Sequence, residues 1–330
     1  MNKILITMGD PAGIGPEIVV KAINEYYKKD NNYIPVVIGS FSILDYYIKK
    51  LNLDLKIEKL NDLNKINELS LNEKKLYLIE EELDLEKLEI GKVTKLAGEY
   101  TMKYLERGLK LVQDKYFDAM TTAPISKDAI NLAGYKYSGH TTFLADRTNT
   151  DEYAMVLKGN KITVVLNTTH LSMIDAIAEV KKDSIINKIK FADEAKKKLG
   201  IKTKIAVAGL NPHNGENGLF GDEEAREIIP AIEESKKLGI DVEGPIVPDN
   251  LFVKMLQDKY NIAVVMYHDQ GLIPMKMESF GKGVNITLGL PIVRTSVDHG
   301  TAFDIAGKGI ADFGSLIEAI ETAEIIIENN

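Results

Sequence analysis

The stretch Ile262-Ala263-Val264-Val265-Met266-Tyr267-His268 is a short apolar run with a histidine just beyond it. The same arrangement occurs at Ile162-Thr163-Val164-Val165-Leu166, before His170, and at Ile205-Ala206-Val207-Ala208, before His213. Apolar runs of this length, bounded by Asn, Pro, Gly and Asp, are typical of buried strands in a parallel sheet. Ligands bind beyond the carboxyl ends of such strands, so we expect the three imidazoles to converge on one crevice.

Composition sets the size and excludes several functions. A chain of 330 residues with 45% apolar content predicts a substantial core and two domains. The net charge of -8 argues against nucleic-acid binding. Because cysteine is absent, disulfides and a thiol nucleophile are excluded, and a metal must be bound by His, carboxylate or water. The first strand is too short for a signal peptide and no apolar run approaches the roughly 18 residues of a membrane span, so we expect a cytoplasmic protein.

Predicted strands and helices alternate along the chain, which indicates a doubly wound α/β architecture. Besides the strands before the three histidines, strands are predicted over 4–8, 35–38, 76–79 and 119–121. Helices are predicted from 16 and over 41–51, 94–114, 184–199 and 222–238. Residues 52–92 are rich in Leu, Lys, Glu and Asn with one clear strand, and we interpret them as a solvated surface elaboration.

Two loops in the first half combine glycines with polar groups. Gly9–Glu17 connects a strand to a helix but lacks the Gly-x-Gly-x-x-Gly dinucleotide spacing, so a tight connection is the simpler interpretation. Asp10 is its one suggestive carboxylate. Thr121–Lys127 and Ser138–Thr142 hold hydroxyls, a lysine and a histidine that could bind phosphate or carboxylate, although a plain loop with a capping hydroxyl would look the same.

The three histidines together predict a metal site. One histidine after a strand is more often a hydrogen-bonded loop residue than a ligand, but three in equivalent positions favour a metal. Three neutral imidazoles leave a coordination position open, as in a catalytic Lewis-acid site. Zinc suits nitrogen ligands best, with Mg or Co as alternatives. Further along, Lys276, Lys282 and Arg294 stand among glycines and strand residues, which predicts an anion site where Arg294 grips a carboxylate or phosphate with two hydrogen bonds.

In this order, the segments closely resemble the 4-hydroxythreonine-4-phosphate dehydrogenase family of pyridoxal phosphate biosynthesis. The most specific matches are Gly9–Glu17, Tyr267-His268-Asp269-Gln270-Gly271, and the stretch from Gly283 to Gly309. The resemblance implies an isocitrate/isopropylmalate dehydrogenase-like fold, with two α/β/α domains and an active-site cleft between them. We expect one domain over 1–127 plus 275–330, carrying the cofactor loop, and another over 128–274, carrying the metal and the dimer interface.

The resemblance also implies roles for individual residues. A divalent metal would be held by His170, His213 and His268. Substrate would be bound by His140, Thr141, Lys276, Asn285 and Arg294 at the interface of a homodimer. The segment His299–Gly309 resembles the adenosine-binding loop of the wider superfamily, with His299, Gly300, Thr301, Ala302 and Asp304 as cofactor-binding residues. Asp304 would accept hydrogen bonds from the ribose hydroxyls, which favours NAD over NADP.

The implied reaction is oxidation of 4-phosphohydroxy-L-threonine at its C3 hydroxyl, followed by β-decarboxylation to 3-amino-2-oxopropyl phosphate and CO2. The metal would ease deprotonation of that hydroxyl and stabilise the enolate left by decarboxylation. Lys276, Asp249 and Asp269 are the candidates for proton transfer, and the sequence does not rank them.

One residue departs from the family pattern, since Thr142 stands where Glu is common. A sister branch that oxidises 4-phospho-D-threonate or 4-phospho-D-erythronate to dihydroxyacetone phosphate also tends to have Ile-Pro before the substrate lysine, as in Ile273-Pro274 here. Two other classes of function remain open from the sequence. One is acyl transfer to phosphate, which needs no metal triad, and the other is a metal-binding protein without enzymatic activity.

Overall fold

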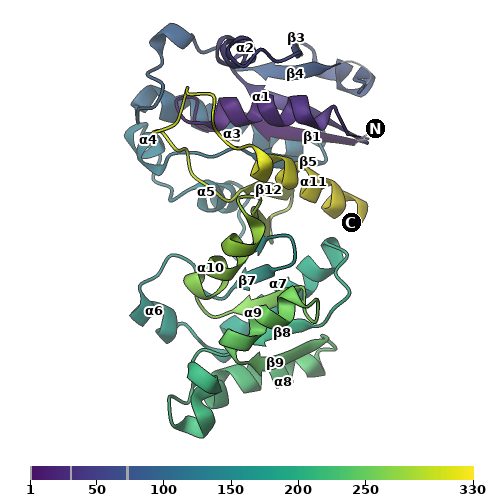
Figure 1. Ribbon diagram of the computed structural model, residues 1–330. Coiled ribbons are helices and arrows are strands. Elements are labelled where there is room, and N and C mark those ends of the chain that lie inside the picture. The colour runs from purple at the N-terminus through teal and green to yellow at the C-terminus, as the bar shows by residue number, and fades with distance from the viewer. Residues whose placement is uncertain (1, 30–31, 72–73) are drawn as a thin grey trace. The chain divides into compact units, whose positions relative to one another are not determined.

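The computed structural model describes residues 2–29, 32–71 and 74–330. The chain forms two compact units. Unit 1 comprises the residues up to Asp151 together with Leu290–Ile327, and unit 2 comprises Glu152–Gly289 with the last three residues. Figure 1 labels the elements of both. None of the helices in the described ranges is long and apolar enough to cross a membrane.

Unit 1 is built on a parallel sheet with the strand order β3-β4-β2-β1-β5-β12. Its strands are β1 (Asn2–Thr7), β2 (Tyr33–Gly39), β3 (Lys56–Lys59), β4 (Lys75–Glu80), β5 (Ala119–Thr122) and β12 (Val293–Val297). Its helices are α1 (Gly15–Tyr26), α2 (Phe41–Lys50), α3 (Lys95–Gln113), α4 (Lys127–Leu132), α5 (His140–Arg147) and α11 (Gly314–Glu328), with short 3-10 turns η1 (Leu63–Glu68) and η2 (Leu85–Lys87).

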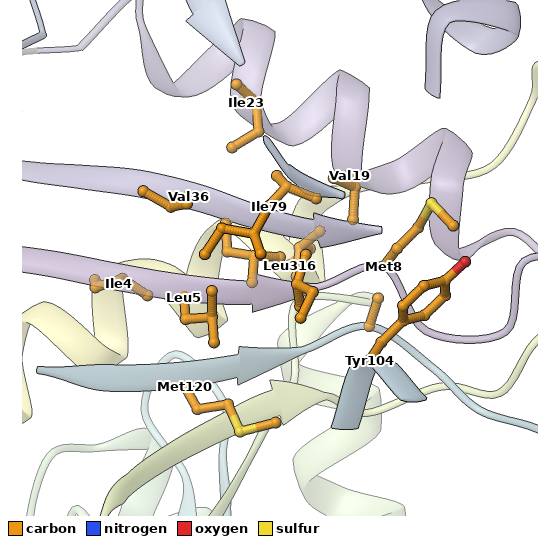
Figure 2. Packing of buried hydrophobic residues seen from close by; sticks show 14 of the residues in the cluster. Ile4, Leu5, Met8, Val19, Ile23, Val36, Ile79, Tyr104, Met120 and Leu316 are labelled. Atoms are coloured by element: carbon orange, nitrogen blue, oxygen red, sulfur yellow. The ribbon is translucent and has the colours of Figure 1, made fainter. Parts of the chain in front are cut away.

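The core of unit 1 explains why these segments fold together. Central strands are apolar on both faces, and Ile4, Leu5 and Ile6 of β1 are fully buried, as strands covered by helices on both sides require. Figure 2 shows helical residues packed around these strands, including Val19 of α1 and Leu316 of α11. The packing of the helices on the sheet therefore fixes the carboxyl ends of β1, β5 and β12. The polar loops described below begin at these ends.

Unit 2 has the strand order β11-β6-β7-β10-β8-β9. Its strands are β6 (Ala154–Lys158), β7 (Thr163–Leu166), β8 (Ile205–Ala208), β9 (Val242–Ile246), β10 (Ile262–Val265) and β11 (Val284–Leu288). β6 runs antiparallel to β7 and β11, and the pairs from β7 to β9 are parallel. Its helices are α6 (Met173–Ala178), α7 (Lys182–Lys198), α8 (Ile229–Lys237) after a π-turn η4 (Glu224–Ile228), α9 (Pro248–Leu256) and α10 (His268–Ser279), with the turn η3 at Pro212–Gly218.

The strands predicted before the three histidines are confirmed as β7, β8 and β10. The expectation of one clear strand in residues 52–92 is wrong, because β3 also forms there. Its sequence, Lys56-Ile57-Glu58-Lys59, is dominated by charge, and it occupies the edge of the sheet, where charged side chains are tolerated.

The unit boundaries differ from those expected. Residues 128–151 belong to unit 1, because Ile130 and Phe143 lie in its core. Residues 275–289 belong to unit 2, because β11 pairs with β6 and Met275 lies in the core of that unit. His140 is therefore in the same unit as Arg294, and the two residues are described together below.

Candidate active site

Three adjacent parallel strands of unit 2 lead to the three histidines. The strands β7, β10 and β8 are neighbours in the sheet, and their following segments carry His170, His268 and His213. The rings of His170 and His268 lie 5.7 Å apart between centroids. His213 is exposed on the turn η3. The sheet thus gathers the three strand ends, and two of the imidazoles are in direct contact.

Buried polar side chains tie these strand ends to one another. The Thr168 hydroxyl after β7 donates to the carbonyl of Met266 after β10, at 3.0 Å. Gln270 accepts from the Met266 N–H at 2.7 Å and donates to the carbonyl of Gly209, after β8, at 2.7 Å. The Thr168 hydroxyl and the Gln270 amide keep all of these hydrogen bonds only while the strand ends stay in this arrangement. They therefore fix the relative positions of the three loops that carry the histidines.

The loop that carries His213 has an unusual backbone. His213, Asn214, Glu216 and Asn217 all have left-handed φ values, between 42° and 57°. Such conformations are unfavourable for residues with a Cβ and persist only where surrounding contacts enforce them. Strain of this kind clusters at ligand sites, which supports a functional role for the loop.

A buried carboxylate anchors the backbone immediately before that loop. Glu224 is 2% exposed and accepts hydrogen bonds from the N–H groups of Leu210 and Asn211, at 2.8 and 2.7 Å. Asn214 donates from its side chain to the Pro245 carbonyl at 2.9 Å. Neither Glu224 nor Asn214 carried a signal in the sequence, because a single buried polar residue has no periodic pattern.

Within the described ranges, no group of three His, Asp or Glu side chains is arranged to hold a metal. Asp269 lies 2.6 Å from Nδ1 of His268, so this carboxylate orients the imidazole. The imidazole nitrogens of His170 and His268 suit a divalent ion such as zinc. Two imidazoles alone provide only part of a coordination shell.

The other candidates of unit 2 are spread over α9, α10 and β11. Lys276 and Asp249 are exposed, on α10 and in the first turn of α9. Asn285 is half-buried on β11. Asp269 is exposed beside His268.

Unit 1 holds a buried cation. Arg294 on β12 is 2% exposed, and its Nη2 donates to the Thr122 hydroxyl at the end of β5, at 2.8 Å. Burial lowers the pKa of Arg294 to about 9, so the guanidinium remains charged at neutral pH. Because a guanidinium carries several N–H donors in a planar fork, this position is suited to hydrogen-bond an anionic ligand.

His140, at the start of α5, is electrically coupled to that cation. Burial, and then the positive charge of Arg294, hold the pKa of His140 well below its usual range, although the imidazole donates to the Ala123 carbonyl. Its Nε2 is shielded from solvent and has no hydrogen-bond partner in the part of the chain that the structure describes. The donor is therefore Nδ1, and the lone pair on Nε2 is available to accept from a ligand hydroxyl or amine.

Thr142, where the family commonly has Glu, is engaged locally. Its hydroxyl donates to the Gly139 carbonyl at 3.1 Å and accepts from the Ser138 N–H at 3.2 Å. These bonds close the turn that precedes His140 and Thr141. Thr142 thus shapes the turn without adding charge to it.

The candidate cofactor loop, His299–Gly309, packs against the glycine-rich turn of unit 1. The Ile14 N–H donates to the Thr301 carbonyl at 3.0 Å, and a Cβ on Gly13 would lie 2.9 Å from Thr301. Asp304 is exposed at the middle of the loop, while His299 contacts the Gly300 carbonyl through Nδ1 at 3.0 Å. An exposed carboxylate on a fixed loop fits the ribose hydroxyls of a dinucleotide. The glycine-rich turn therefore also supports the backbone of this loop at Thr301.

Asp10 is a buried carboxylate in the same turn. It is fully buried, and its Oδ1 accepts from the Ala12 N–H at 2.9 Å. Burial raises the pKa of Asp10 to about 6, and the N–H groups of Ala12 and Gly13 offset only part of that change. Desolvation therefore outweighs the two hydrogen bonds.

The raised pKa predicts a stabilising substitution. The folded protein binds the Asp10 proton more tightly than the unfolded chain, so ionisation lowers the free energy of unfolding as pH rises from about 4 to about 6. We expect Asp10→Asn to raise that free energy by about 1–3 kcal/mol at pH 8 and by little near pH 4. Urea unfolding at both pH values measures this. The matched control is Asp62→Asn, which removes an exposed carboxylate with the same 2.9 Å contact to an N–H two residues on. A loss of stability at pH 8 would show that the Asp10 charge is compensated.

These arrangements define a class, that of α/β proteins whose polar side chains gather after the carboxyl ends of parallel strands. The chain belongs to the family described as pyridoxal phosphate biosynthetic protein PdxA, whose model matches residues 31–323. It is 43% identical to a 4-hydroxythreonine-4-phosphate dehydrogenase from Sulfurihydrogenibium sp., covering 99% of this chain and 98% of the relative. It is also 43% identical to a protein of Oceanobacillus iheyensis provisionally named D-threonate 4-phosphate dehydrogenase, covering 96% of each.

Solved structures agree with this membership. The 4-hydroxythreonine-4-phosphate dehydrogenase of Klebsiella pneumoniae superposes with a TM-score of 0.87 at 40% identity, covering 99% of this chain and 100% of that one. A β-decarboxylating dehydrogenase from Thermococcus kodakarensis superposes with a TM-score of 0.50 at 15% identity, covering 96% of this chain and 81% of that one. At that identity the likeness concerns the fold alone, and it confirms the expected dehydrogenase-like fold.

Proposed function

We propose that the protein oxidises 4-phosphohydroxy-L-threonine at its C3 hydroxyl with NAD and a divalent metal, and then releases CO2 to give 3-amino-2-oxopropyl phosphate. The observation that carries the proposal is the buried Arg294 beside the neutral His140 in a chain of this family. A buried guanidinium next to a neutral imidazole is suited to hydrogen-bond a small dianionic substrate. Because a phosphorylated metabolite and NAD are retained inside cells, we propose that the protein acts in the cytoplasm.

The residues of unit 1 would bind and orient the substrate. Arg294 offers two parallel N–H donors to a phosphate or carboxylate, and Thr122 holds its guanidinium in place. Nε2 of His140 accepts a hydrogen bond from a hydroxyl or an amine. Thr141 follows it on the first turn of α5 and would add a hydroxyl contact. Together these contacts would discriminate a phosphorylated hydroxy acid from an unphosphorylated one.

Proton transfer would be carried by residues of unit 2. Oxidation requires the C3 hydroxyl proton to leave while hydride passes to NAD, and the enolate formed after loss of CO2 must be protonated at carbon. The candidates for these proton transfers are Lys276, Asp249 and Asp269. Lys276 and Asn285 would also contact the substrate. Asp269 is held by His268, which favours an orienting role for this carboxylate.

The metal would be held by His170, His213 and His268. When bound, it supplies Lewis-acid stabilisation of the substrate oxygen. We propose that the coordination shell is completed in a homodimer. The segments after each histidine expose large apolar side chains, which a second copy would cover: Leu171, Met173, Ile174, Ile177, Leu219, Phe220, Ile273 and Met277.

The nicotinamide cofactor would be bound by the loop of His299, Gly300, Thr301, Ala302 and Asp304. The Asp304 carboxylate is exposed and can accept from both ribose hydroxyls. The same negative charge would repel a 2'-phosphate, so we propose NAD as the cofactor.

The second candidate is 4-phospho-D-threonate or 4-phospho-D-erythronate, giving dihydroxyacetone phosphate. The observation that favours it is Thr142, which supplies no negative charge near His140, whereas the family's Glu would attract a substrate ammonium group. The equal identity to relatives of both names does not separate the two.

A direct comparison of substrates tests the proposal. Initial rates of NADH formation by zinc-supplemented protein are measured on 4-phosphohydroxy-L-threonine and on 4-phospho-D-threonate. We expect kcat/KM to be at least about tenfold higher for the amino acid. A reversed preference would assign the chain to the sugar-acid reaction, and Thr142→Glu should then shift the preference back. No turnover of either compound would exclude both.

A further inference from the structure

A buried ion pair in α1 lies outside the residues assigned above. Nζ of Lys21 is 2.7 Å from Oε1 of Glu17, one turn earlier on the helix. The Glu17 side chain is fully buried, and that of Lys21 is 15% exposed. Burying two charges costs more desolvation than an apolar pair of the same size, so the stability of α1 does not explain their presence.

Both charges bind the backbone at the end of the candidate cofactor loop. Glu17 accepts from the N–H groups of Gly309 and Ala311, at 3.1 and 2.8 Å. Lys21 donates to the carbonyls of the same two residues, at 3.0 and 2.8 Å. The pair therefore satisfies both the donors and the acceptors of this short segment, which an apolar pair could not do.

The loop between its two attachments is short and internally bonded. At its start, the Thr301 carbonyl accepts from the Ile14 N–H. Within it, Ile305 donates to the Ala302 carbonyl and Lys308 donates to the Ile305 carbonyl, each at 3.1 Å. These two hydrogen-bonded turns connect Asp304 to the attachment points at Thr301 and Gly309. The attachment at Gly309 therefore also helps to determine where the Asp304 carboxylate lies.

We propose that Glu17 and Lys21 are positioning residues that hold the loop His299–Gly309 in the conformation that binds the adenosine part of NAD. This inference rests on the proposed function, because it takes the loop as the cofactor site. The pair contacts neither substrate nor cofactor and acts through the backbone of residues 309–311.

Replacing Glu17 by Gln should release the loop with little change in volume. The two N–H groups bond to different oxygens of Glu17, Gly309 to Oε2 and Ala311 to Oε1, and in glutamine one of these oxygens becomes an NH2 group that opposes the N–H facing it. We expect the dissociation constant for NADH, measured by fluorescence titration, to rise about tenfold, and KM for NAD with it. KM for the phosphorylated substrate and kcat should stay within about twofold. Amide hydrogen exchange at 309–311 should be faster without any ligand.

Two further variants keep the test sharp. Glu25→Gln is the matched control, because Glu25 lies on the same helix and pairs with Lys28 at 2.7 Å, but on the exposed surface. It should change neither NADH affinity nor exchange. The double variant Glu17→Leu/Lys21→Met removes both charges, keeps the apolar volume that α1 buries, and should weaken NADH as much as Glu17→Gln does.

The outcomes separate the inference from the proposed function. If the unaltered protein binds NADH and Glu17→Gln and the double variant bind it equally well, the positioning role is overturned while the cofactor assignment stands. If Glu17→Gln raises KM for NAD and for substrate alike, with unchanged exchange at 309–311, the loop mechanism is wrong. If the unaltered protein binds no NADH, both are overturned.

Discussion

Replacing Arg294 by Met is expected to raise KM for the phosphorylated substrate by roughly 100-fold or more, with KM for NAD nearly unchanged. The side chain is 2% exposed and its charge remains at neutral pH, so its ion pair with an anionic ligand forms away from bulk water. Losing one member of such a buried, hydrogen-bonded pair costs about 2–5 kcal/mol, and each 1.4 kcal/mol is a factor of about ten. Steady-state kinetics with each reactant varied in turn measures this.

Arg294→Lys separates charge from geometry. Lysine keeps the positive charge but loses the two parallel donors and the contact to Thr122, so we expect an intermediate loss, of about tenfold. Thr122→Val should give a smaller increase in the same KM, because it removes only the support of the guanidinium. Equal losses for substrate and NAD in Arg294→Met would show that Arg294 does not lie at the substrate anion.

The second large effect is expected at the histidines. Replacing His268 or His213 by Ala should lower kcat by about 1000-fold or more and abolish stoichiometric zinc in the purified protein, measured by elemental analysis. The reason is that a bound metal contributes several kcal/mol of charge stabilisation to the reacting oxygen. Removing zinc with a chelator should have the same effect, and adding zinc back should restore the rate.

Glu216→Gln is the control for the metal experiment. Glu216 is an exposed carboxylate in the same left-handed loop as His213, so its replacement tests whether a neighbouring charge matters. We expect full zinc content and unchanged kcat. An active, zinc-free His213→Ala would instead favour a reaction without a metal, such as acyl transfer to phosphate.

The positions of the strands before the three histidines can be predicted from the sequence, because a strand is indicated by the pattern of neighbouring residues. Short apolar runs before His170, His213 and His268 correspond to β7, β8 and β10, and their adjacency in the sheet explains why three polar loops meet at one edge. The helix expected over 94–114 is α3, which begins after a Thr94 cap that accepts from the Ala97 N–H. Periodicity and capping are properties of neighbouring residues and can be read directly.

The rest depends on contacts between distant residues. That β6 runs antiparallel between β11 and β7 leaves no trace in its apolar sequence. The unit boundaries differ from the expected ones because Phe143 and Met275 belong to cores whose other members come from distant parts of the chain. The burial of Asp10 and the attachment of Glu17 to Gly309 come from packing, and a lone carboxylate has the same appearance in sequence whether exposed or buried.

The most direct test of the whole account is the stoichiometry of the reaction. Zinc-supplemented protein is incubated with NAD and 4-phosphohydroxy-L-threonine, and NADH and CO2 are measured in the same samples with time. The account predicts that both appear together in equal amounts, and that neither forms when zinc is chelated or NAD is omitted. CO2 without NADH, NADH without CO2, or turnover without metal would contradict it.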